Sequence, residues 1–427
     1  MTIQNIHDLF LKCSKVSIDT RKIEPNSFFV AIKGERFDAN TFAKEALDKG
    51  ASFVIIDNAN YYIDERTILV NDSLETLQEL AKFHRQFLNL PIIALTGSNG
   101  KTTTKELINV VLSKKFDTKA TVGNLNNHIG VPLTLLTFTK ETQIGIVEMG
   151  ANHQKEIEFL CEIAQPDYGY ITNFGKAHLE GFGGVEGVIK GKSEMYTYLK
   201  SNNKLVFVNL DDEIQNQKSV AFKRITFSQK DKRATVFIEN VMANPFVKIK
   251  TLGVEINSHL IGLYNANNIN ASITIGCNFE VPVFDIKDAI ESYVPENNRS
   301  QLLTKGTNEI ILDAYNANPS SMLVALENFI QLDKSNKCII IGDMYELGEE
   351  SLDEHKGIVS FLNSNSNFEC HFVGKDFFAN SIQKENFHFY TTFEDFAKYL
   401  SSVKPEHKTL LIKGSRGMAL ERTLEYL

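Results

Sequence analysis

The chain has 427 residues, of which 43% are hydrophobic and 23% are charged, and its formal net charge is −8. This composition is typical of a globular protein, and the length predicts about two to four domains. The acidic balance argues against a nucleic-acid partner, because there is no excess of lysine and arginine to neutralise phosphates.

The cysteines and the first residues of the chain bear on its compartment. Five cysteines occur without a C-x-x-C pair, which favours reduced thiols over disulfides or a zinc site: Cys13, Cys161, Cys277, Cys338 and Cys370. The N-terminal residues MTIQNIHDLFLKC lack the basic and apolar segments of a signal peptide. No apolar run reaches the ~18 residues of a membrane span. We therefore expect a cytoplasmic protein with no membrane insertion.

Residues 1–89 alternate short predicted strands with helical stretches. Strands are predicted over residues 27–32 and 52–56, and helices over residues 41–49 and 74–88. The pattern predicts a small α/β domain. The cluster Asp19-Thr20-Arg21 precedes the first clear strand, and its residue types are also those of an ordinary turn.

A glycine-containing loop follows within residues 91–104, PIIALTGSNGKTTT. An apolar run rich in β-branched residues leads into Gly97 and Gly100, and apolar residues at helical spacing follow Lys101. The glycines let the backbone approach an anion, toward which the N–H groups of a helix N-terminus would point. Lys101 can reach terminal phosphates and the Thr102 hydroxyl can bind Mg²⁺. The segment predicts a nucleoside triphosphate site.

The loop differs from the standard phosphate-binding motif G-x-x-x-x-G-K-[ST] at one position. The first glycine of that motif would fall on Leu95. The same residues could also form an ordinary glycine turn beside a surface lysine, with no bound phosphate. The predicted strand before the loop and helix after it are, however, the context that the motif requires.

Residues 90–296 predict a doubly wound α/β domain around this loop. Its strands are predicted over residues 92–96, 144–148, 168–172 and 205–208. Ligands of such sheets gather at the carboxyl ends of the strands. Glu148 ends the second strand and His178 follows the third, so the two side chains are candidates to share a metal ion near the loop. Taken alone, each would be an ordinary strand-end or loop residue.

The end of this domain changes character. Alternating stretches at residues 235–240 and 247–252 predict an antiparallel β insertion, and a helix of small residues is predicted from Asn265 onward. Asn265 and Asn268 could contact a base edge or cap that helix. Residues 295–300 predict a linker and a domain boundary.

Residues 297–427 predict a third, Rossmann-like domain. Strands are predicted over residues 309–313, 338–341, 371–373 and 409–412, and helices over residues 319–332, 352–362, 393–400 and 417–427. Polar residues such as Asp313, Asn316 and Arg416 follow strand ends. A sheet with this row of groups is predicted to face the nucleotide.

Several of these segments resemble the ATP-dependent Mur ligases of peptidoglycan synthesis. Residues 96–103, TGSNGKTT, are similar to the modified phosphate-binding loop of that family. Residues 123–132, 148–153 and 313–319 resemble segments of the family member that adds D-alanyl-D-alanine. The resemblance covers essentially the whole chain. It implies an α/β fold of three domains, with a central P-loop doubly wound sheet flanked by a small N-terminal α/β domain and a C-terminal Rossmann-like domain.

The resemblance implies an ATP site shared by the central and C-terminal domains. Lys101 would neutralise the β- and γ-phosphates, Asp313 would contact the ribose and Asn316 would lie near the phosphates. The residues that the resemblance assigns to the nucleotide are Gly97, Ser98, Asn99, Gly100, Lys101, Thr102, Thr103, Asn265, Asn268, Arg299, Asp313 and Asn316.

The resemblance also implies Mg²⁺ and a modified lysine. The metal ligands would be Thr102, Glu148, His178 and Lys192. Lys192 matches the family's carbamylated lysine, whose added carboxylate can bind a second Mg²⁺. Lys190 competes for that assignment. Lys101, Lys192 and His178 are the expected catalytic residues.

Substrate contacts are expected in two places. Thr20 and Arg21 match the family's D-S-R segment, which touches the UDP part of the substrate, and the threonine keeps the hydroxyl. Asn124, Asn126 and Asn127 are the other candidates. The chain departs from the family at Asp38-Ala39-Asn40, where D-G-H is common.

The implied reaction is the ATP-dependent addition of D-alanyl-D-alanine to UDP-N-acetylmuramoyl-tripeptide through an acyl phosphate. ATP and Mg²⁺ are the expected cofactors, and a monomer is expected. A sister ligase that adds the third residue, or a folate polyglutamate ligase, would share the loop, Glu148 and His178. A binding module that hydrolyses ATP only as a switch is an alternative from another class.

Overall fold

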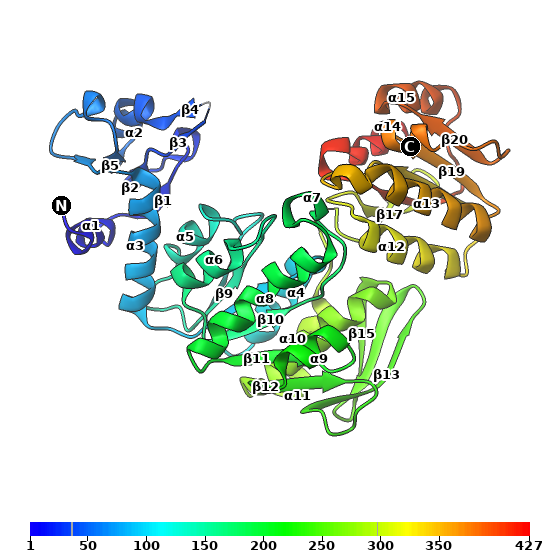
Figure 1. The fold of residues 1–427 in the computed structure, drawn as a ribbon, viewed down its shortest axis with the longest axis horizontal. Helices are drawn as coiled ribbons and strands as arrows, with labels where there is room; N and C mark the ends of the chain where they lie inside the picture. The colour runs from blue at the N-terminus through cyan, green and yellow to red at the C-terminus, as the bar shows by residue number, and fades with distance from the viewer. Residues whose placement is uncertain (36, 297) are drawn as a thin grey trace.

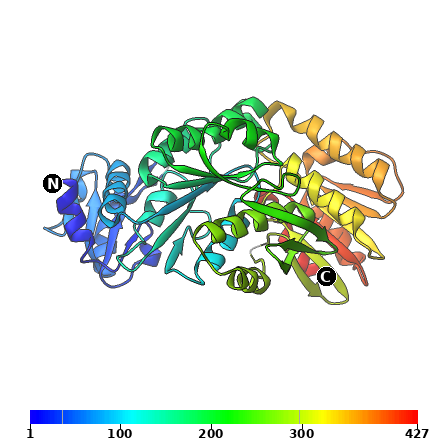
Figure 2. The ribbon, with the colours of Figure 1, turned by 90° about the horizontal axis from the view of Figure 1, so that it is seen from below.

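The computed structural model describes residues 1–35, 37–296 and 298–427 of the chain. Three domains, each with its own main sheet, follow one another along an elongated molecule (Figures 1 and 2). The N-terminal and C-terminal domains lie at opposite ends of the central domain. The predicted α/β class and three-domain architecture are confirmed. The boundaries at residues 89/90 and 296/297 stay predictions, and residue 297 lies outside the described residues.

The N-terminal domain forms around a parallel sheet of order β1-β2-β5-β6. Its strands are β1 (Lys15–Ser17), β2 (Ser27–Val30), β5 (Ala51–Ile56) and β6 (Thr67–Leu69), beside a hairpin of β3 (Lys33–Gly34) and β4 (Phe37–Asp38). Its helices are α1 (Ile3–Phe10), α2 (Ala43–Asp48) and α3 (Ser73–Leu88). Both predicted strands and both predicted helices are present, with ends shifted by one or two residues.

The central domain contains a nine-stranded sheet of order β15-β14-β13-β12-β11-β10-β7-β9-β8. Its strands are β7 (Ile92–Thr96), β8 (Thr118–Ala120), β9 (Ile144–Glu148), β10 (Tyr168–Ile171), β11 (Leu205–Asn209), β12 (Lys223–Ser228), β13 (Val236–Ala243), β14 (Phe246–Thr251) and β15 (Val254–Ile261). Strands β8 to β13 pair in parallel, whereas β13, β14 and β15 are antiparallel. The predicted antiparallel segment is therefore confirmed as an extension of the main sheet.

Helices cover both faces of this sheet. They are α4 (Lys101–Leu112), α5 (Gly130–Leu135), α6 (Glu156–Ala164), α7 (Leu179–Phe182), α8 (Val185–Ser201), α9 (Glu213–Ser219), α10 (Ala266–Asn278) and α11 (Val283–Ser292). In β7, Ile92 and Ala94 join one hydrophobic core while Ile93 and Leu95 join the other. Burial on both faces explains why this strand is a continuous apolar run.

The C-terminal domain has a six-stranded sheet of order β16-β17-β21-β18-β19-β20, in which only β16 is antiparallel to its neighbour. The strands are β16 (Gln301–Lys305), β17 (Asn308–Asp313), β18 (Lys337–Gly342), β19 (Glu369–Val373), β20 (Phe387–Tyr390) and β21 (Thr409–Lys413). The helices are α12 (Pro319–Gln331), α13 (Ser351–Asn365), α14 (Lys375–Ala379) and α15 (Phe393–Ser402).

The predicted C-terminal helix over residues 417–427 is wrong. The chain forms two 3₁₀ segments instead, η6 (Arg416–Met418) and η7 (Leu420–Tyr426). Ala419 lies between them with a φ of +47°, a left-handed conformation that interrupts any right-handed helix.

Across the described residues, none of the helices combines the length and the apolar character needed to cross a bilayer.

A buried arginine ties α3 to the central sheet. Arg85 of α3 donates from Nε to the Ala164 carbonyl at 3.1 Å and from a terminal nitrogen to Asp167 Oδ2 at 2.8 Å. Asp167 also accepts from the Ile92 amide at the start of β7 at 3.1 Å. The ion pair therefore links the helix that leaves the N-terminal domain to the strand that carries the glycine loop.

We expect Arg85→Ala to lower the free energy of unfolding by about 2 kcal/mol, because the Ala164 and Gln165 carbonyls lose their donor and Asp167 keeps only its ion pair with Lys204. The measurement is the first unfolding transition in urea. Arg66→Ala, which removes the more exposed pair with Asp64, is the control and should cost less than about 1 kcal/mol. Equal midpoints for the two variants would contradict a structural role for Arg85.

Candidate functional site

The loop after β7 requires glycine at two positions. Gly97 has a φ of +142°, and an added Cβ would overlap the Thr172 hydroxyl. Gly100 has a φ of +78°, and an added Cβ would meet the side chain of Asn268. A side chain would be strained at both positions. Because α4 begins directly after Gly100, the predicted order of strand, loop and helix is confirmed.

Hydrogen bonds to the segment after β10 hold this loop in place. Ser98 Oγ donates to the Gly175 carbonyl at 2.6 Å. Asn99 donates its amide to Asn173 Oδ1 at 3.2 Å, and its carbonyl accepts from Thr172 Oγ1 at 2.6 Å. The loop is thus shaped before any ligand binds. The N-terminus of α4, with its unpaired N–H groups, is a ready anion site.

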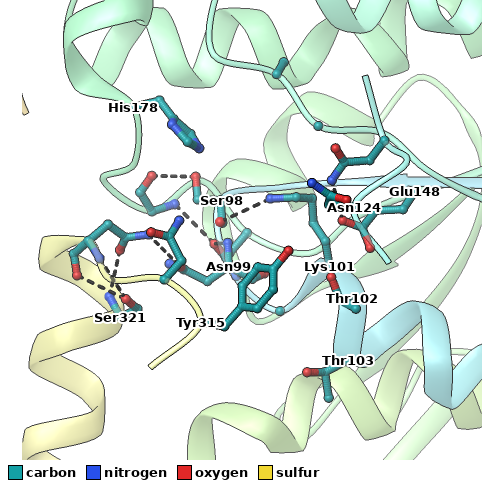
Figure 3. Close-up of a pocket in the computed structure, with 18 of the residues that line it drawn as sticks. Ser98, Asn99, Lys101, Thr102, Thr103, Asn124, Glu148, His178, Tyr315 and Ser321 are labelled. Carbon is teal, nitrogen blue, oxygen red and sulfur yellow. Dashed lines mark hydrogen bonds between the residues drawn. The ribbon is translucent and has the colours of Figure 1, made fainter. Parts of the chain in front are cut away.

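A cavity of about 1070 Å³ opens beside the loop, between the central and C-terminal domains. Most of the sequence-predicted residues line it, namely Ser98, Asn99, Gly100, Lys101, Thr102, Thr103, Asn124, Asn126, Asn127, Glu148, His178, Asn265, Asn268, Arg299, Asp313 and Asn316. Figure 3 shows Lys101, Thr102, Asn124 and Glu148 close together, with Tyr315 beside them. Gly97, Lys192, Thr20 and Arg21 are not among the lining residues.

Lys101 curls back over its own loop. Its Nζ donates to the Gly97 carbonyl at 2.7 Å and lies 3.4 Å from the Ser98 carbonyl. Burial lowers the pKa of Lys101, Glu148 opposes that shift, and Arg299 adds to it. An anion in the cavity would relieve both the desolvation and the repulsion, so the site is suited to a strongly negative ligand.

Glu148, the last residue of β9, has the features of a metal ligand. Its side chain is 2% exposed, and Oε1 accepts from Asn126 Nδ2 at 2.8 Å. Oε2 is buried and has no hydrogen-bond partner among the described residues. A buried carboxylate oxygen without a partner is costly unless a cation completes it. With the Thr102 hydroxyl on the same cavity, these oxygen donors fit Mg²⁺.

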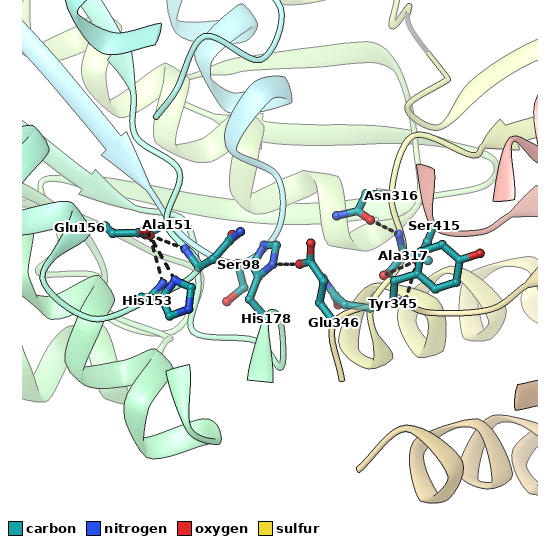
Figure 4. Close-up of polar contacts among 12 residues, drawn as sticks. Ser98, Ala151, His153, Glu156, His178, Asn316, Ala317, Tyr345, Glu346 and Ser415 are labelled. Carbon is teal, nitrogen blue, oxygen red and sulfur yellow. Dashed lines mark hydrogen bonds and ion pairs between the residues drawn. The ribbon is translucent and has the colours of Figure 1, made fainter. Parts of the chain in front are cut away.

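His178 lies at the edge of the cavity, where the central and C-terminal domains meet. It precedes α7 with a φ of +54°, and its Nδ1 pairs with the carboxylate of Glu346 in the C-terminal domain (Figure 4). The hydrogen bond with His178 lowers the pKa of Glu346, so that carboxylate stays charged. Because Nδ1 is engaged, Nε2 is the nitrogen that could face a metal.

Lys192 is buried in α8, behind the cavity wall. Its side chain is 1% exposed, and Nζ donates to the carbonyl of Ala151, a lining residue, at 3.1 Å. Burial, followed by repulsion from Lys101, lowers the pKa of Lys192 well below its usual value. A buried, readily uncharged amine is suited to react with CO₂. Its competitor Lys190 is exposed on the same helix.

The two predicted asparagines of α10 are engaged with the protein. Asn268 Nδ2 donates to Asn265 Oδ1 at 2.9 Å, and Asn268 Oδ1 accepts from Thr104 Oγ1 at 3.0 Å. Asn265 Nδ2 donates to the Ile261 carbonyl at 2.8 Å, and its side chain does not cap the helix. Asn268 therefore joins α10 to α4, Asn265 joins the start of α10 to the end of β15, and both residues also line the cavity.

The C-terminal domain supplies the opposite wall of the cavity. Asp313, at the end of β17, accepts from Lys413 Nζ at 2.6 Å and from the Ser300 amide at 3.1 Å. The guanidinium carbon of Arg299 lies 3.7 Å from the centre of the Tyr315 ring, which is a close cation–π contact. The positions of Asp313 and Arg299 are therefore defined by neighbours on their own domain.

The substrate candidates divide into two groups. Asn124 and Asn126 line the cavity beside Glu148, whereas Asn127 has a structural task as well. Its Oδ1 accepts from the amides of Ile129 and Gly130 at 3.1 and 2.9 Å, which forms the turn before α5.

Thr20 and Arg21 lie away from this cavity, in the N-terminal domain. Arg21 is 85% exposed and forms a two-point pair with Asp19, at 2.9 and 2.8 Å. Asp19 also caps the short 3₁₀ turn by accepting from the Arg21 amide. The segment thus has the turn structure that its residue types predict. Any ligand contact there would be separate from the phosphate loop.

Asn40, which stands where the family commonly has histidine, is fully buried and has a structural role. Asn40 Nδ2 donates to Asp38 Oδ1 and Asp57 Oδ1, each at 2.7 Å, and Asn40 Oδ1 accepts from the Asp57 amide. Asn40 therefore holds a turn of the N-terminal domain to the end of β5.

The sequence interpretation assigned no individual role at the site to two aromatic residues and one carboxylate. Tyr315 and Tyr264 line the cavity, and the Tyr264 hydroxyl lies 2.7 Å from Ser300 Oγ. Their positions beside Asp313 and Asn265 in the sequence are the signal that could have identified them. Glu346 has no such signal, because its partner His178 is 168 residues away.

Three family models match successive parts of the chain. "Mur ligase family, catalytic domain" matches residues 12–85, "Mur ligase middle domain" matches residues 95–276, and "Mur ligase, glutamate ligase domain" matches residues 298–416.

Curated and solved relatives extend over nearly the whole chain. The UDP-N-acetylmuramoyl-tripeptide–D-alanyl-D-alanine ligase of Bacillus subtilis (strain 168) is 33% identical, and the alignment covers 96% of this chain and 92% of that protein. The structure of MurF from Acinetobacter baumannii matches with a TM-score of 0.87 at 29% identity, over 99% of this chain and 97% of that one. MurF ligase from Thermotoga maritima, solved in complex with ADP, has a TM-score of 0.84 at 27% identity, with 98% and 97% coverage.

Proposed function

This chain belongs to the Mur ligase family, and we propose that it joins D-alanyl-D-alanine to UDP-N-acetylmuramoyl-tripeptide at the expense of ATP. The product is UDP-MurNAc-pentapeptide, a precursor of peptidoglycan. The observation that carries this proposal is the cavity between two domains, where a phosphate loop, an unpartnered carboxylate oxygen and C-terminal cations meet. Full-length similarity to ligases of this name supports the choice of substrates.

In this proposal the nucleotide binds at the loop after β7. The triphosphate lies against the N-terminus of α4, and Lys101 leaves the Gly97 carbonyl to neutralise the β- and γ-phosphates. Thr102, Glu148 and His178 would hold Mg²⁺. A bound Mg²⁺ offsets the negative charge on the phosphoryl group during transfer. Asn268 and Asp313 hold the nucleoside from opposite sides of the cavity.

The acceptor carboxylate is a poor electrophile until it is phosphorylated. One of its oxygens attacks the γ-phosphorus of ATP, and ADP leaves with the bridging oxygen. The amine of D-alanyl-D-alanine then attacks the acyl carbon, phosphate departs with the transferred oxygen, and the amine loses a proton as the amide forms. Asn124 and Asn126, which line the cavity with Glu148, would orient the acceptor.

Contacts between domains protect this chemistry. Asn318 Nδ2 of the C-terminal domain donates to Asn99 Oδ1 of the loop at 2.7 Å, and Lys176 Nζ pairs with Glu354 at 2.5 Å. Together with the contact between His178 and Glu346, these bonds hold the C-terminal domain over the phosphate site. Water exclusion matters because an acyl phosphate hydrolyses readily.

Lys192 acts as its carbamate in this proposal. Its amine adds to CO₂ and loses a proton, and the resulting carboxylate would serve as a ligand for a second Mg²⁺. The low exposure of Lys192 and its lowered pKa support this role.

We also propose that the enzyme acts as a monomer in the cytoplasm, where ATP is available.

We expect Lys192→Ala to lower turnover by about 100-fold, because it removes a group that orients the reacting charges. An added short-chain carboxylic acid such as acetate should restore part of the rate by replacing the carbamate. Lys190→Ala, which changes an exposed neighbour, is the control and should keep the parental rate. Full activity of Lys192→Ala without acetate would remove this residue from the site.

We expect Tyr315→Ala to weaken ADP binding about fivefold, the equivalent of about 1 kcal/mol for the lost cation–π contact that positions Arg299. Tyr315→Phe keeps the ring and should bind ADP as the parent does. Isothermal titration of both variants gives the dissociation constants. Equal weakening in the two variants would assign the effect to the hydroxyl instead.

The reaction is tested by phosphate release from ATP and Mg²⁺ in the presence of UDP-MurNAc-tripeptide, with and without D-alanyl-D-alanine. Release that depends on both substrates, with UDP-MurNAc-pentapeptide identified by mass, is the expected result. Lys101→Ala should reduce the rate about 1000-fold, because it removes the charge that meets the γ-phosphate.

Two other outcomes would overturn the proposal in different ways. Release that needs neither substrate would indicate a nucleotide switch. Release only with UDP-MurNAc-dipeptide and a diamino acid would indicate the sister ligase, with the ATP site unchanged.

A further inference from the structure

A second cluster of reactive side chains lies in the C-terminal domain, on a different part of its sheet from the cavity. Cys338 is near the start of β18, Glu369 begins β19, and His371 is two residues further along β19. In the parallel register Cys338 is opposite Glu369, and His371 is opposite His388 of β20. The four side chains therefore share one face of the sheet, near the amino ends of three adjacent strands.

The distances within this cluster are those of a nearly formed metal site. One ligand atom each from Cys338, Glu369 and His371 lies within 4.8 Å of the other two. The Nε2 of His371 is 3.1 Å from Glu369 Oε1, and the Nε2 of His388 is 4.0 Å from the same oxygen. Ligand atoms around a tetrahedral Zn²⁺ are about 3.5 Å apart. Small side-chain rotations would suffice to close the site.

We propose that Cys338, Glu369, His371 and His388 form a binding site for a divalent transition metal of the zinc class. A thiolate, two imidazoles and a carboxylate are the donors that Zn²⁺ and Co²⁺ accept, whereas Mg²⁺ prefers oxygen alone. The proposal is independent of the ligase reaction. It concerns the other end of the sheet from the nucleotide.

The neighbours of the cluster support the ligands in the way a metal site requires. The Tyr390 hydroxyl lies 3.3 Å from His371 Nδ1, so this hydrogen bond can leave Nε2 free for a metal. Lys408 Nζ lies 3.2 Å from Glu369 Oε2, and Tyr399 donates to Oε1 at 3.3 Å.

The two cysteines of this region differ in their surroundings. Cys338 is 1% exposed and belongs to the core under α15, whereas Cys370 belongs to the core on the opposite face of the sheet. As a metal ligand, the Cys338 thiol would release its proton when the cation binds. Access from solvent is through the partly exposed His388 and Glu369.

A metal at this position would link β18, β19 and the edge strand β20. In Figure 1, β19 and β20 lie near α15 at one end of the molecule. Since the metal binds the folded sheet and not the separated strands, it would stabilise the C-terminal domain by mass action. The scattered cysteines gave no sign of such a site, because its ligands come from three strands.

The test is a Co²⁺ titration of the full-length protein after treatment with a chelator, in excess Mg²⁺ to occupy the nucleotide site. The expected result is one equivalent of Co²⁺ with a thiolate-to-metal charge-transfer band and tetrahedral visible bands. None of the described residues that line the cavity is a cysteine, so Co²⁺ bound there cannot give this band. Zn²⁺ should displace the Co²⁺ and raise the thermal midpoint.

Variants make the test specific. Cys338→Ser should abolish the charge-transfer band and weaken binding by about 100-fold or more, and Cys370→Ser should leave both unchanged. Absence of the band in the parent, or its persistence in Cys338→Ser, would overturn the proposal. If Cys338→Ser does not fold, Glu369→Gln decides, since it keeps the thiol and the side-chain size. Glu369→Gln should weaken Co²⁺ binding at least about tenfold, and an unchanged affinity would overturn the proposal.

Discussion

Lys101 and Arg299 line one cavity of this protein, Lys192 is buried behind its wall, and burial lowers the pKa of both lysines. Arg299 lowers the pKa of Lys101 further, and Lys101 in turn lowers that of Lys192. Mutual repulsion in a poorly hydrated site is relieved when an anion binds. The arrangement is therefore complementary to a triphosphate and to the carbamate that one of these lysines is proposed to carry.

The site is divided between two domains, and this division serves access to it. The phosphate loop and Glu148 belong to the central sheet, whereas Arg299 and Asp313 reach the cavity from the C-terminal domain. A site assembled from two bodies can admit a large nucleotide and peptide when open and exclude water when closed. The pair of His178 and Glu346 is a contact through which the position of one domain affects a candidate metal ligand in the other.

The C-terminal sheet presents different chemistry at its two ends. At the carboxyl ends of its strands, Asp313 and Lys413 form a buried pair beside the cavity. At the amino ends, Cys338, Glu369 and His371 form the cluster proposed to hold a transition metal. The length of the strands separates the two ends of the sheet. A metal could therefore stabilise the amino ends without changing the side chains that line the cavity at the carboxyl ends. Parallel strands make this possible because all of their amino ends lie on one edge.

The sequence by itself determined the structural elements that depend only on residues close together in the chain. The apolar run of β7, the glycines that let the loop approach an anion and the spacing of α4 are properties of neighbouring residues, and all three were predicted. Strand ends such as Glu148 and Asp313 were identified because the carboxyl edge of a parallel sheet is where ligands gather. The family resemblance added Lys192, whose own segment indicates only a helix.

Only the tertiary structure decided the contacts between distant residues. Residues 417–427 have helical spacing, yet the left-handed Ala419 divides them into two 3₁₀ segments. The partner of His178 is 168 residues away, and the stacking of Arg299 on Tyr315 depends on how the chain turns between β16 and β17. Cys338 and His371 meet because β18 and β19 are neighbours. A local sequence pattern indicates the backbone conformation and the burial of each residue. It does not indicate which side chain from a distant part of the sequence will contact that residue.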